Sequence, residues 1–505
     1  MKNLKAKLLK MDWRKKSNAP PKPSRTSLAA QPAVPGSDPV SPSLEMLSSP
    51  MFNTAMEALR KLKHEAKGAT PFTEPDSFRP CGHHARAMLT ACSGSVAAGV
   101  ALGFASAAMP SIEHRFWRDA LPGPPENRWI ADSLFLGASV GSLLSGGLTM
   151  FWVGLMFANK ISMIIVNRVA LGIFVGVITN CVCLYVTDVA PPAKRTLYGG
   201  LIEVATGAGV LCAYALANLA WQQQAAGCAM ASVPVLVLHH YVVENPRWLV
   251  SKGLSLHADT AVMRLYGLDP PDDFRDRKGV GVEEQNAAVA PSRLWPRHAR
   301  MVSTCLLLHL LQNISGAQMC LLRAVQVMSN MVTEVSPRLL AVVLVSMQFA
   351  CTILATFLTQ VVSRRTQLGA SAFLVSCTLF IFRPLEHLAF THWSVRDQPS
   401  RTSWGAVFSV TMLLLAYSVG LCHLPTLLTG ELVPSRIRLL GSSIVWSSRW
   451  FVMFLLLHYD VDVLNAFRER GPLLALSLTL TVVATTAILL IPETEGKSLA
   501  QIEHG

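Results

Sequence analysis

The stretch Asp188-Val-Ala-Pro-Pro-Ala-Lys-Arg195 decides the fold, because its pattern returns as Glu431-Leu-Val-Pro-Ser-Arg-Ile-Arg438. In both stretches an acid closes a long apolar segment, a proline follows at +3 and an arginine at +7. A second signal lies further along each half, as Val243-Glu-Asn-Pro-Arg-Trp-Leu249 and as Ile491-Pro-Glu-Thr-Glu-Gly-Lys-Ser-Leu499. Ionic residues at matching places in two apolar halves predict a chain that arose by duplication.

The composition indicates a membrane protein built from helices. Of 505 residues, 51% are apolar and 15% are charged, and apolar runs recur from Arg86 to Ile491. Each run is about 20 residues long, the length that crosses a ~30 Å hydrocarbon core as a helix. Together with the duplication, this predicts an all-α membrane protein of the kind found among helical transporters.

The apolar runs also predict how the chain is divided. We expect membrane spans near 87–109, 130–150, 161–186, 197–220, 224–243, 301–332, 337–360, 368–390, 404–428, 440–459 and 471–491. The expected divisions are a basic cytosolic tail (1–85), a first bundle (86–243), a cytosolic linker (244–300), a second bundle (301–491) and a short cytosolic tail (492–505).

The charge of the first segment predicts its side of the membrane. Residues 1–68 hold 13 of the 44 Lys and Arg residues against five acids, which places the N-terminus in the cytosol by the positive-inside rule. The tail is either a disordered extension or, over Lys2–Lys16, a basic amphipathic segment on anionic lipid. Nucleic acid is a poor partner for this chain, because its remaining charge is scattered over short loops.

The sequence holds no recognisable catalytic or metal-binding pattern. Most of the eleven cysteines lie inside apolar segments, where they resemble buried small hydrophobes more than a disulfide framework. We find no nucleophile–base set, no metal-ligand spacing and no phosphate-binding glycine loop. We therefore expect no enzyme activity, no metal and no cofactor.

Several short blocks carry a family resemblance over residues 86–503. They are Asn167-Arg168…Gly172, YVTDVAPPAKR, VENPRWL, LQNISG, GELVPSRIR and PETEGKSL. With them the chain resembles the sugar porter family of the major facilitator superfamily, especially the facilitative hexose and trehalose transporters of arthropods. The resemblance implies two pseudo-symmetric six-helix bundles with about 11–12 spans. It also implies facilitative transport of a hexose or trehalose by rocker-switch alternating access, in the plasma membrane.

The resemblance further implies a cytosolic gate made of charged residues. In the family, ion pairs at the cytosolic helix ends hold the two bundles together while the pathway faces outward. Such charges, partly shielded from water, can bias a two-state equilibrium. The matching positions here are Arg168, Asp188, Arg195, Glu244, Arg247, Arg364, Arg365, Glu431, Arg438 and Glu493.

A sugar site is implied at the midplane between the halves. Amides in apolar spans suit it, because an unsatisfied amide there is costly. Gln312 could bind sugar or could hydrogen-bond a neighbouring helix, and the same alternatives stand for Gln348. The full set of implied sugar-binding positions is Gln312, Asn313, Gln318, Gln348, Glu203 and Trp450.

The chain also departs from the family pattern. Glu203 stands in place of a glutamine, Thr426 in place of a tryptophan and Arg449 in place of an asparagine, and Leu322-Arg323 stand where two tyrosines are usual. One hypothesis pairs Glu203 with Arg449 or with Arg323.

A further departure is a deletion. A basic loop and about half a helix are missing between the second and third helices, after Gly146-Gly147. The departures leave two alternatives to sugar transport: a non-transporting, degenerate paralogue, or a transporter of a charged organic solute.

Overall fold

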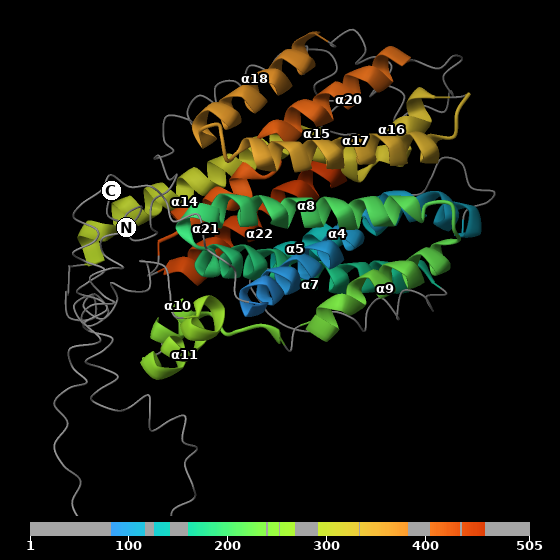
Figure 1. The fold of residues 1–505 in the computed structure, drawn as a ribbon. Helices are drawn as coiled ribbons and strands as arrows, with labels where there is room; N and C mark the ends of the chain where they lie inside the picture. Colours follow the sequence, from blue (N-terminus) through green and yellow to red (C-terminus); the bar gives the residue numbers. More distant parts are fainter. Residues whose placement is uncertain are drawn as a thin grey trace, which may run out of the picture. The chain divides into compact units, whose positions relative to one another are not determined.

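The parts of the chain that can be described are helical. The computed structural model describes residues 82–116, 126–141, 160–238, 241–251, 253–267, 291–332, 334–381, 404–434 and 437–459, which contain helices and no strand. All of them belong to one unit, Arg79–Gly505. The all-α fold class predicted from the sequence is confirmed (Figure 1).

The helices follow the predicted spans closely. In the first half they are α4 (Gly82–Phe116), α5 (Glu126–Gly141), α7 (Ile161–Val189), η1 (Pro192–Lys194), α8 (Arg195–Ala215), α9 (Trp221–Leu238), α10 (Pro246–Ser251) and α11 (Ser255–Tyr266). In the second half they are α14 (Pro291–Ile314), α15 (Ala317–Leu322), α16 (Ala324–Met331), α17 (Pro337–Leu358), α18 (Arg364–Ile381), α20 (Trp404–Val419), α21 (Leu424–Leu432) and α22 (Arg438–His458).

Within these residues, six segments are long and apolar enough to cross a membrane. They are Gly82–Phe116, Ile161–Val189, Arg195–Ala215, Pro337–Leu358, Trp404–Leu432 and Arg438–His458. Several crossings in one chain define a multi-pass integral membrane protein.

Glycines allow the helices of the first half to pack closely. A Cβ on Gly137 of α5 would strike the backbone of α7, and a Cβ on Gly172 of α7 would strike the backbone of α5. Gly99 of α4 and Gly209 of α8 are related in the same reciprocal way. Small residues at such crossings replace the hydrophobic driving force that lipid cannot supply.

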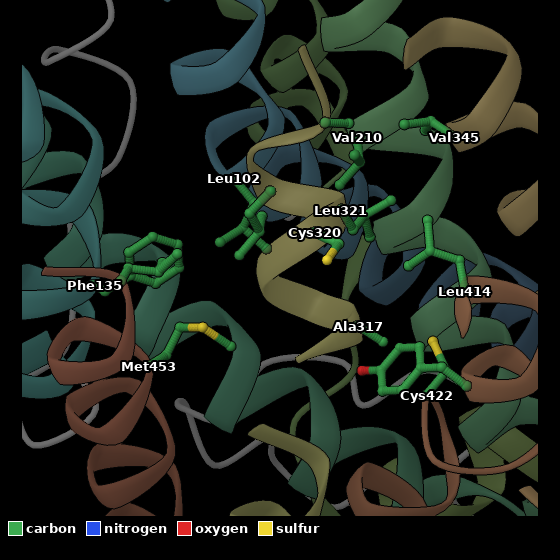
Figure 2. Close-up of a cluster of buried hydrophobic side chains, with 14 of the residues drawn as sticks. Leu102, Phe135, Val210, Ala317, Cys320, Leu321, Val345, Leu414, Cys422 and Met453 are labelled. Carbon is green, nitrogen blue, oxygen red and sulfur yellow. The ribbon is translucent and has the colours of Figure 1, made fainter. Parts of the chain in front are cut away.

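The two halves meet along matching pairs of helices. α5 of the first half contacts α22 of the second, and α8 of the first half contacts α17 of the second (Figure 1). Apolar side chains from both halves, including Leu102, Val210, Leu321 and Met453, belong to one buried cluster (Figure 2). The sugar site that the family resemblance implies, at the midplane between the halves, would lie at this shared interface.

Two spans that we expected to be continuous are broken. In the 301–332 span, α14 ends at Ile314, and a new helix, α15, begins after Gly316 (φ +71°). A second interruption, at Arg323, separates α15 from α16. Residues 404–428 divide between α20 and α21. Discontinuous helices free backbone groups inside a membrane bundle, and such breaks are typical of transporter binding sites.

Some expectations lie outside the described residues. They concern the N-terminal tail, most of the region between α5 and α7, much of the central linker, the last span and Glu493.

Candidate functional site

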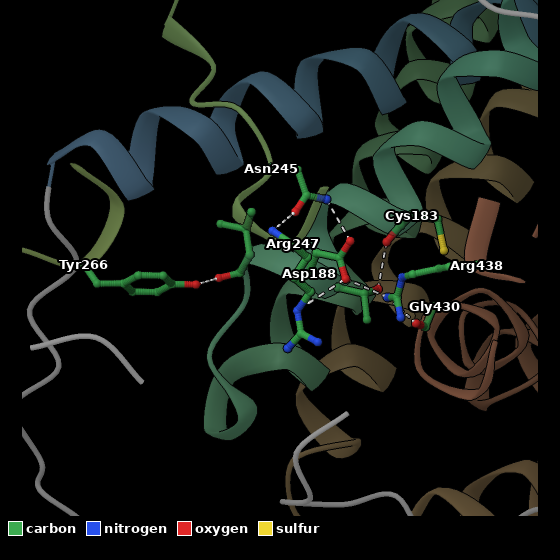
Figure 3. Close-up of polar contacts among 9 residues, drawn as sticks. Cys183, Asp188, Asn245, Arg247, Tyr266, Gly430 and Arg438 are labelled. Carbon is green, nitrogen blue, oxygen red and sulfur yellow. Dashed lines mark hydrogen bonds and ion pairs between the residues drawn. The ribbon is translucent and has the colours of Figure 1, made fainter. Parts of the chain in front are cut away.

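A cluster of charges lies at the end of the bundle where α7 ends, which we call the Asp188 end. Asp188 Oδ1 forms an ion pair with Arg438 at 3.0 Å and lies 3.6 Å from the Nε of Arg247, and Oδ2 accepts a hydrogen bond from Asn245 at 2.7 Å. Figure 3 shows the carboxylate between the two arginines. Because Asp188 belongs to the first half and Arg438 to the second, this cluster joins the halves.

A second pair lies beside it and involves the repeated acid. Glu431 pairs with Arg364, and both side chains are almost fully buried. Arg364 also donates to the Thr196 hydroxyl at 2.6 Å, and Thr196 lies on α8 of the first half. Arg438 donates in addition to the carbonyl of Gly430 at 2.7 Å. We call Asp188, Arg247, Arg438, Glu431 and Arg364 the gate cluster.

Two predicted gate residues lie elsewhere. Arg168 is fully buried and donates to the carbonyls of Ala101 and Ile130. It lies twenty residues before Asp188 on the same helix, about 30 Å away, so its assignment to the gate is wrong. Glu244 is exposed and forms no ion pair within the described residues. The chain there reaches Asp188 through Asn245 and Arg247.

Two further predicted gate residues, Arg195 and Arg365, lie at helix ends. Arg195 is buried at the start of α8, and Arg365 is half-buried beside Arg364 at the start of α18. Their position at helix ends near the gate cluster is compatible with the prediction, which stays a prediction.

Gln312 lies in a hydrogen-bond network that ties the two broken spans together. Its Nε2 donates to the Cys422 carbonyl at 2.9 Å and to the Tyr417 hydroxyl at 3.1 Å. Its Oε1 lies 3.1 Å from His309 Nδ1, and His309 Nε2 lies 3.0 Å from the Thr429 hydroxyl. Gln312 therefore does hydrogen-bond a neighbouring helix, one of the two alternatives predicted from the sequence. A sugar that binds Gln312 would have to replace these partners.

The neighbouring helices carry buried polar atoms that have no hydrogen-bond partner within the described residues. They are Asn313 Oδ1, Gln318 Oε1, Arg449 Nε, Trp446 Nε1 and Trp450 Nε1. Their helices, α14, α15 and α22, contact one another. Because an unsatisfied buried donor or acceptor costs free energy, a concentration of them indicates a place for polar ligand atoms or water.

Aromatic rings flank this region. Trp450 lies with its ring centroid 6.2 Å from that of Trp446 and 5.9 Å from that of Phe135. The Arg449 guanidinium lies 4.8 Å from the Trp446 centroid and 5.1 Å from the Trp450 centroid. Aromatic and apolar walls beside a few polar groups suit a small-molecule site.

The substituted family positions pair differently from our hypothesis. Glu203 accepts from the Thr426 hydroxyl at 2.6 Å, and Arg323 pairs with Asp132 at 3.0 Å. Two departures, Glu203 and Thr426, therefore contact each other. Gln348 is buried and donates to Thr352 at 3.1 Å.

Sequence reasoning did not find Asp132. It is a single acid in a short apolar run, and no repeat marks it. The signal that could have found it is its isolation, since a lone acid within a predicted span needs a partner.

The fold and these sites define a class of protein: an integral membrane protein with the major facilitator fold. The chain is similar in fold to the proton:xylose symporter XylE bound to 6-bromo-6-deoxy-D-glucose, with a TM-score of 0.70, 16% identity, and coverage of 84% of this chain and 98% of that chain.

The family follows from the sequence. The pattern of the family described as "Sugar (and other) transporter" matches residues 131–505, which is more than half of the chain, and the chain belongs to this family. It is 24% identical to the facilitated trehalose transporter Tret1 of Culex quinquefasciatus over 442 residues, covering 83% of this chain and 84% of that protein. The Tret1 of Aedes aegypti is also 24% identical, over 54% of its own length.

Proposed function

We propose that this protein carries a sugar, trehalose or a hexose, down its gradient across the plasma membrane by alternating access between its halves. The observation that carries the proposal is the group of unsatisfied amide and indole atoms on α14, α15 and α22. Sugar hydroxyls can donate to the Asn313 and Gln318 carbonyl oxygens and accept from the Trp450 N–H. The names of the relatives support trehalose as the first substrate to test.

In this proposal the gate cluster faces the cytosol, as do both termini and residues 244–300. The basic residues at the Asp188 end agree with the positive-inside rule. The ion pair between Asp188 and Arg438 and the hydrogen bond from Arg364 to Thr196 would hold that end closed while the path faces outward. Gln312, Gln348 and Glu203 line the path from the second and first halves.

The test is uptake of radiolabelled trehalose and 2-deoxyglucose in oocytes that express the full chain. We expect uptake above that of water-injected cells, saturating with concentration. Gln318→Leu should lower it at low substrate by about 5- to 150-fold, from 1–3 kcal/mol of lost hydrogen bonding. Gln223→Leu, at an exposed position of α9, is the matched control. Surface biotinylation shows that each variant reaches the membrane.

The outcomes separate the alternatives. Surface-expressed wild type that takes up neither sugar would support the non-transporting paralogue. Uptake that Gln318→Leu leaves unchanged would exclude Gln318 from the sugar site without excluding transport.

A further inference from the structure

A buried ion pair crosses between the halves far from the gate cluster. Arg323 is 8% exposed and Asp132 is 0% exposed. Arg323 Nη2 donates to the two carboxylate oxygens of Asp132 at 3.0 and 3.3 Å and to the Leu457 carbonyl at 2.6 Å. His458 Nδ1 lies 3.5 Å from the same carboxylate. Asp132 belongs to α5 of the first half, and the others belong to the second half.

Arg323 occupies the break between α15 and α16, and the first half also holds the backbone there. The Tyr214 hydroxyl, on α8, donates to the Leu321 carbonyl at 2.7 Å and lies 3.3 Å from the Ala324 N–H, which donates to it. The Ser106 hydroxyl, on α4, accepts from the Val325 N–H at 3.2 Å. The groups that the break frees are thus satisfied by the opposite half.

These contacts lie at the other end of the interface from the gate cluster. Arg168 donates to the carbonyl of Ile130, two residues before Asp132 on α5. Arg168 is itself about 30 Å of helix away from Asp188. We call this region the Asp132 end.

We propose that Asp132 and Arg323 form an ionic lock that closes the Asp132 end of the path, with the α15–α16 break as its hinge. The inference rests on the proposed alternating-access function for its direction, in which the Asp132 end faces outward. Opening this end requires the α15–α16 break to leave α4, α5 and α8 together, so the ion pair and the two hydroxyl contacts part in one step. A buried pair suits this role, because it strongly favours the closed state and is replaced by hydration once separated.

The test measures access and needs no sugar. Cys320 lies one helical turn before Arg323, is 4% exposed, and belongs to the buried cluster drawn in Figure 2. A membrane-impermeant maleimide is applied outside intact cells, and the labelling rate of Cys320 is read by peptide mass spectrometry. Cys305, fully buried on α14, is the internal reference. We expect Asp132→Asn and Arg323→Gln to raise the Cys320 rate by roughly 5- to 30-fold, as removal of one or two kcal/mol would.

Two double variants separate a lock from a merely structural pair. Asp132→Asn with Arg323→Gln leaves no uncompensated buried charge, so it should fold well and still label fast. Asp132→Arg with Arg323→Asp restores the attraction and should return protection toward wild type. Arg338→Gln, which removes an arginine that forms no ion pair with the described residues, is the control and should label like wild type. The lock is overturned if the neutral double variant reaches the membrane and its Cys320 is labelled at the wild-type rate. Trehalose uptake, assayed separately, tells this failure from failure of the transport proposal.

Discussion

The two ends of the interface between the halves are closed by different kinds of ionic contact. Around Asp188 several charges share partners, and the Arg247 and Arg438 side chains remain 16% and 13% exposed, although the neighbouring Glu431–Arg364 pair is buried. At the Asp132 end one fully buried acid serves Arg323, whose side chain is 10% exposed. Shared, partly hydrated charges can exchange partners when one is lost, whereas a buried pair cannot. Asp132→Asn should therefore cost more than Asp188→Asn.

The largest effect is expected for Asp132→Asn, because it leaves the Arg323 guanidinium buried without its carboxylate. Breaking a buried pair by removing one partner costs about 3–5 kcal/mol. The melting temperature of the purified protein in detergent should fall clearly. Adding Arg323→Gln should recover most of the loss. A double variant no more stable than the single would show that Arg323 is not the partner that matters.

Asp188→Asn should have a smaller effect on stability and a clear effect on gating. Asparagine removes the negative charge and with it the ion pair to Arg438, at a cost of about 1.5–3 kcal/mol, the range for contacts with charged groups. The Asp188 end then opens more often, so external trehalose should bind more weakly, while Asp132→Asn should shift binding in the opposite direction. Asp259→Asn, on the exposed face of α11, is the matched control. If Asp188→Asn and Asp132→Asn change the affinity for external trehalose in the same direction, the assignment of the two ends to opposite sides of the membrane is wrong.

Gln312 belongs to neither the gate cluster nor the Asp132–Arg323 pair, so its substitution should not favour opening of either end of the path. Gln312→Leu removes its contacts with Tyr417, Cys422 and His309, and any contact with sugar, at about 1–3 kcal/mol or 5- to 150-fold in affinity. Tyr417→Phe removes one protein contact only. If Gln312 binds sugar, Gln312→Leu lowers uptake far more than Tyr417→Phe at equal melting temperature. Equal losses in both variants would leave Gln312 as a helix–helix tie.

The sequence predicted the Asp188 end because its signal is repeated. Asp188 and Glu431 close apolar runs at matching places, and a helix-end acid followed by arginine at +7 places both groups of charges at the same end of the bundle. The partner of each acid was less predictable. Asp188 takes Arg438 from the opposite half, whereas Glu431 takes Arg364, and spacing alone cannot show which bundle supplies the arginine.

The Asp132 end was not predicted, because tertiary contacts alone create it. Arg323 was noticed as a departure, but its partner lies 191 residues earlier on α5, in a run without any repeat. The misplaced Arg168 has the same cause: a charge near the start of a long helix was grouped with one near its end. Helix spans follow from local apolar length, whereas the groups at the Arg323 break are satisfied by contacts with the other half.

The smallest effect is expected for Thr196→Val, which tests whether a neutral contact across the halves contributes to closure. Thr196 accepts from Arg364 at 2.6 Å, and Arg364 keeps Glu431 when the hydroxyl is lost. The loss is about 1 kcal/mol, or about fivefold in the closed-to-open ratio. External trehalose affinity should weaken slightly while the melting temperature hardly changes. Thr359→Val removes a similar contact, to His423 at 2.8 Å, within the second half. Because that contact does not cross the interface, Thr359→Val should lower the melting temperature and leave the affinity unchanged. A loss of affinity in Thr359→Val as large as in Thr196→Val would mean that closure depends on the internal packing of the second half, not on contacts between the halves.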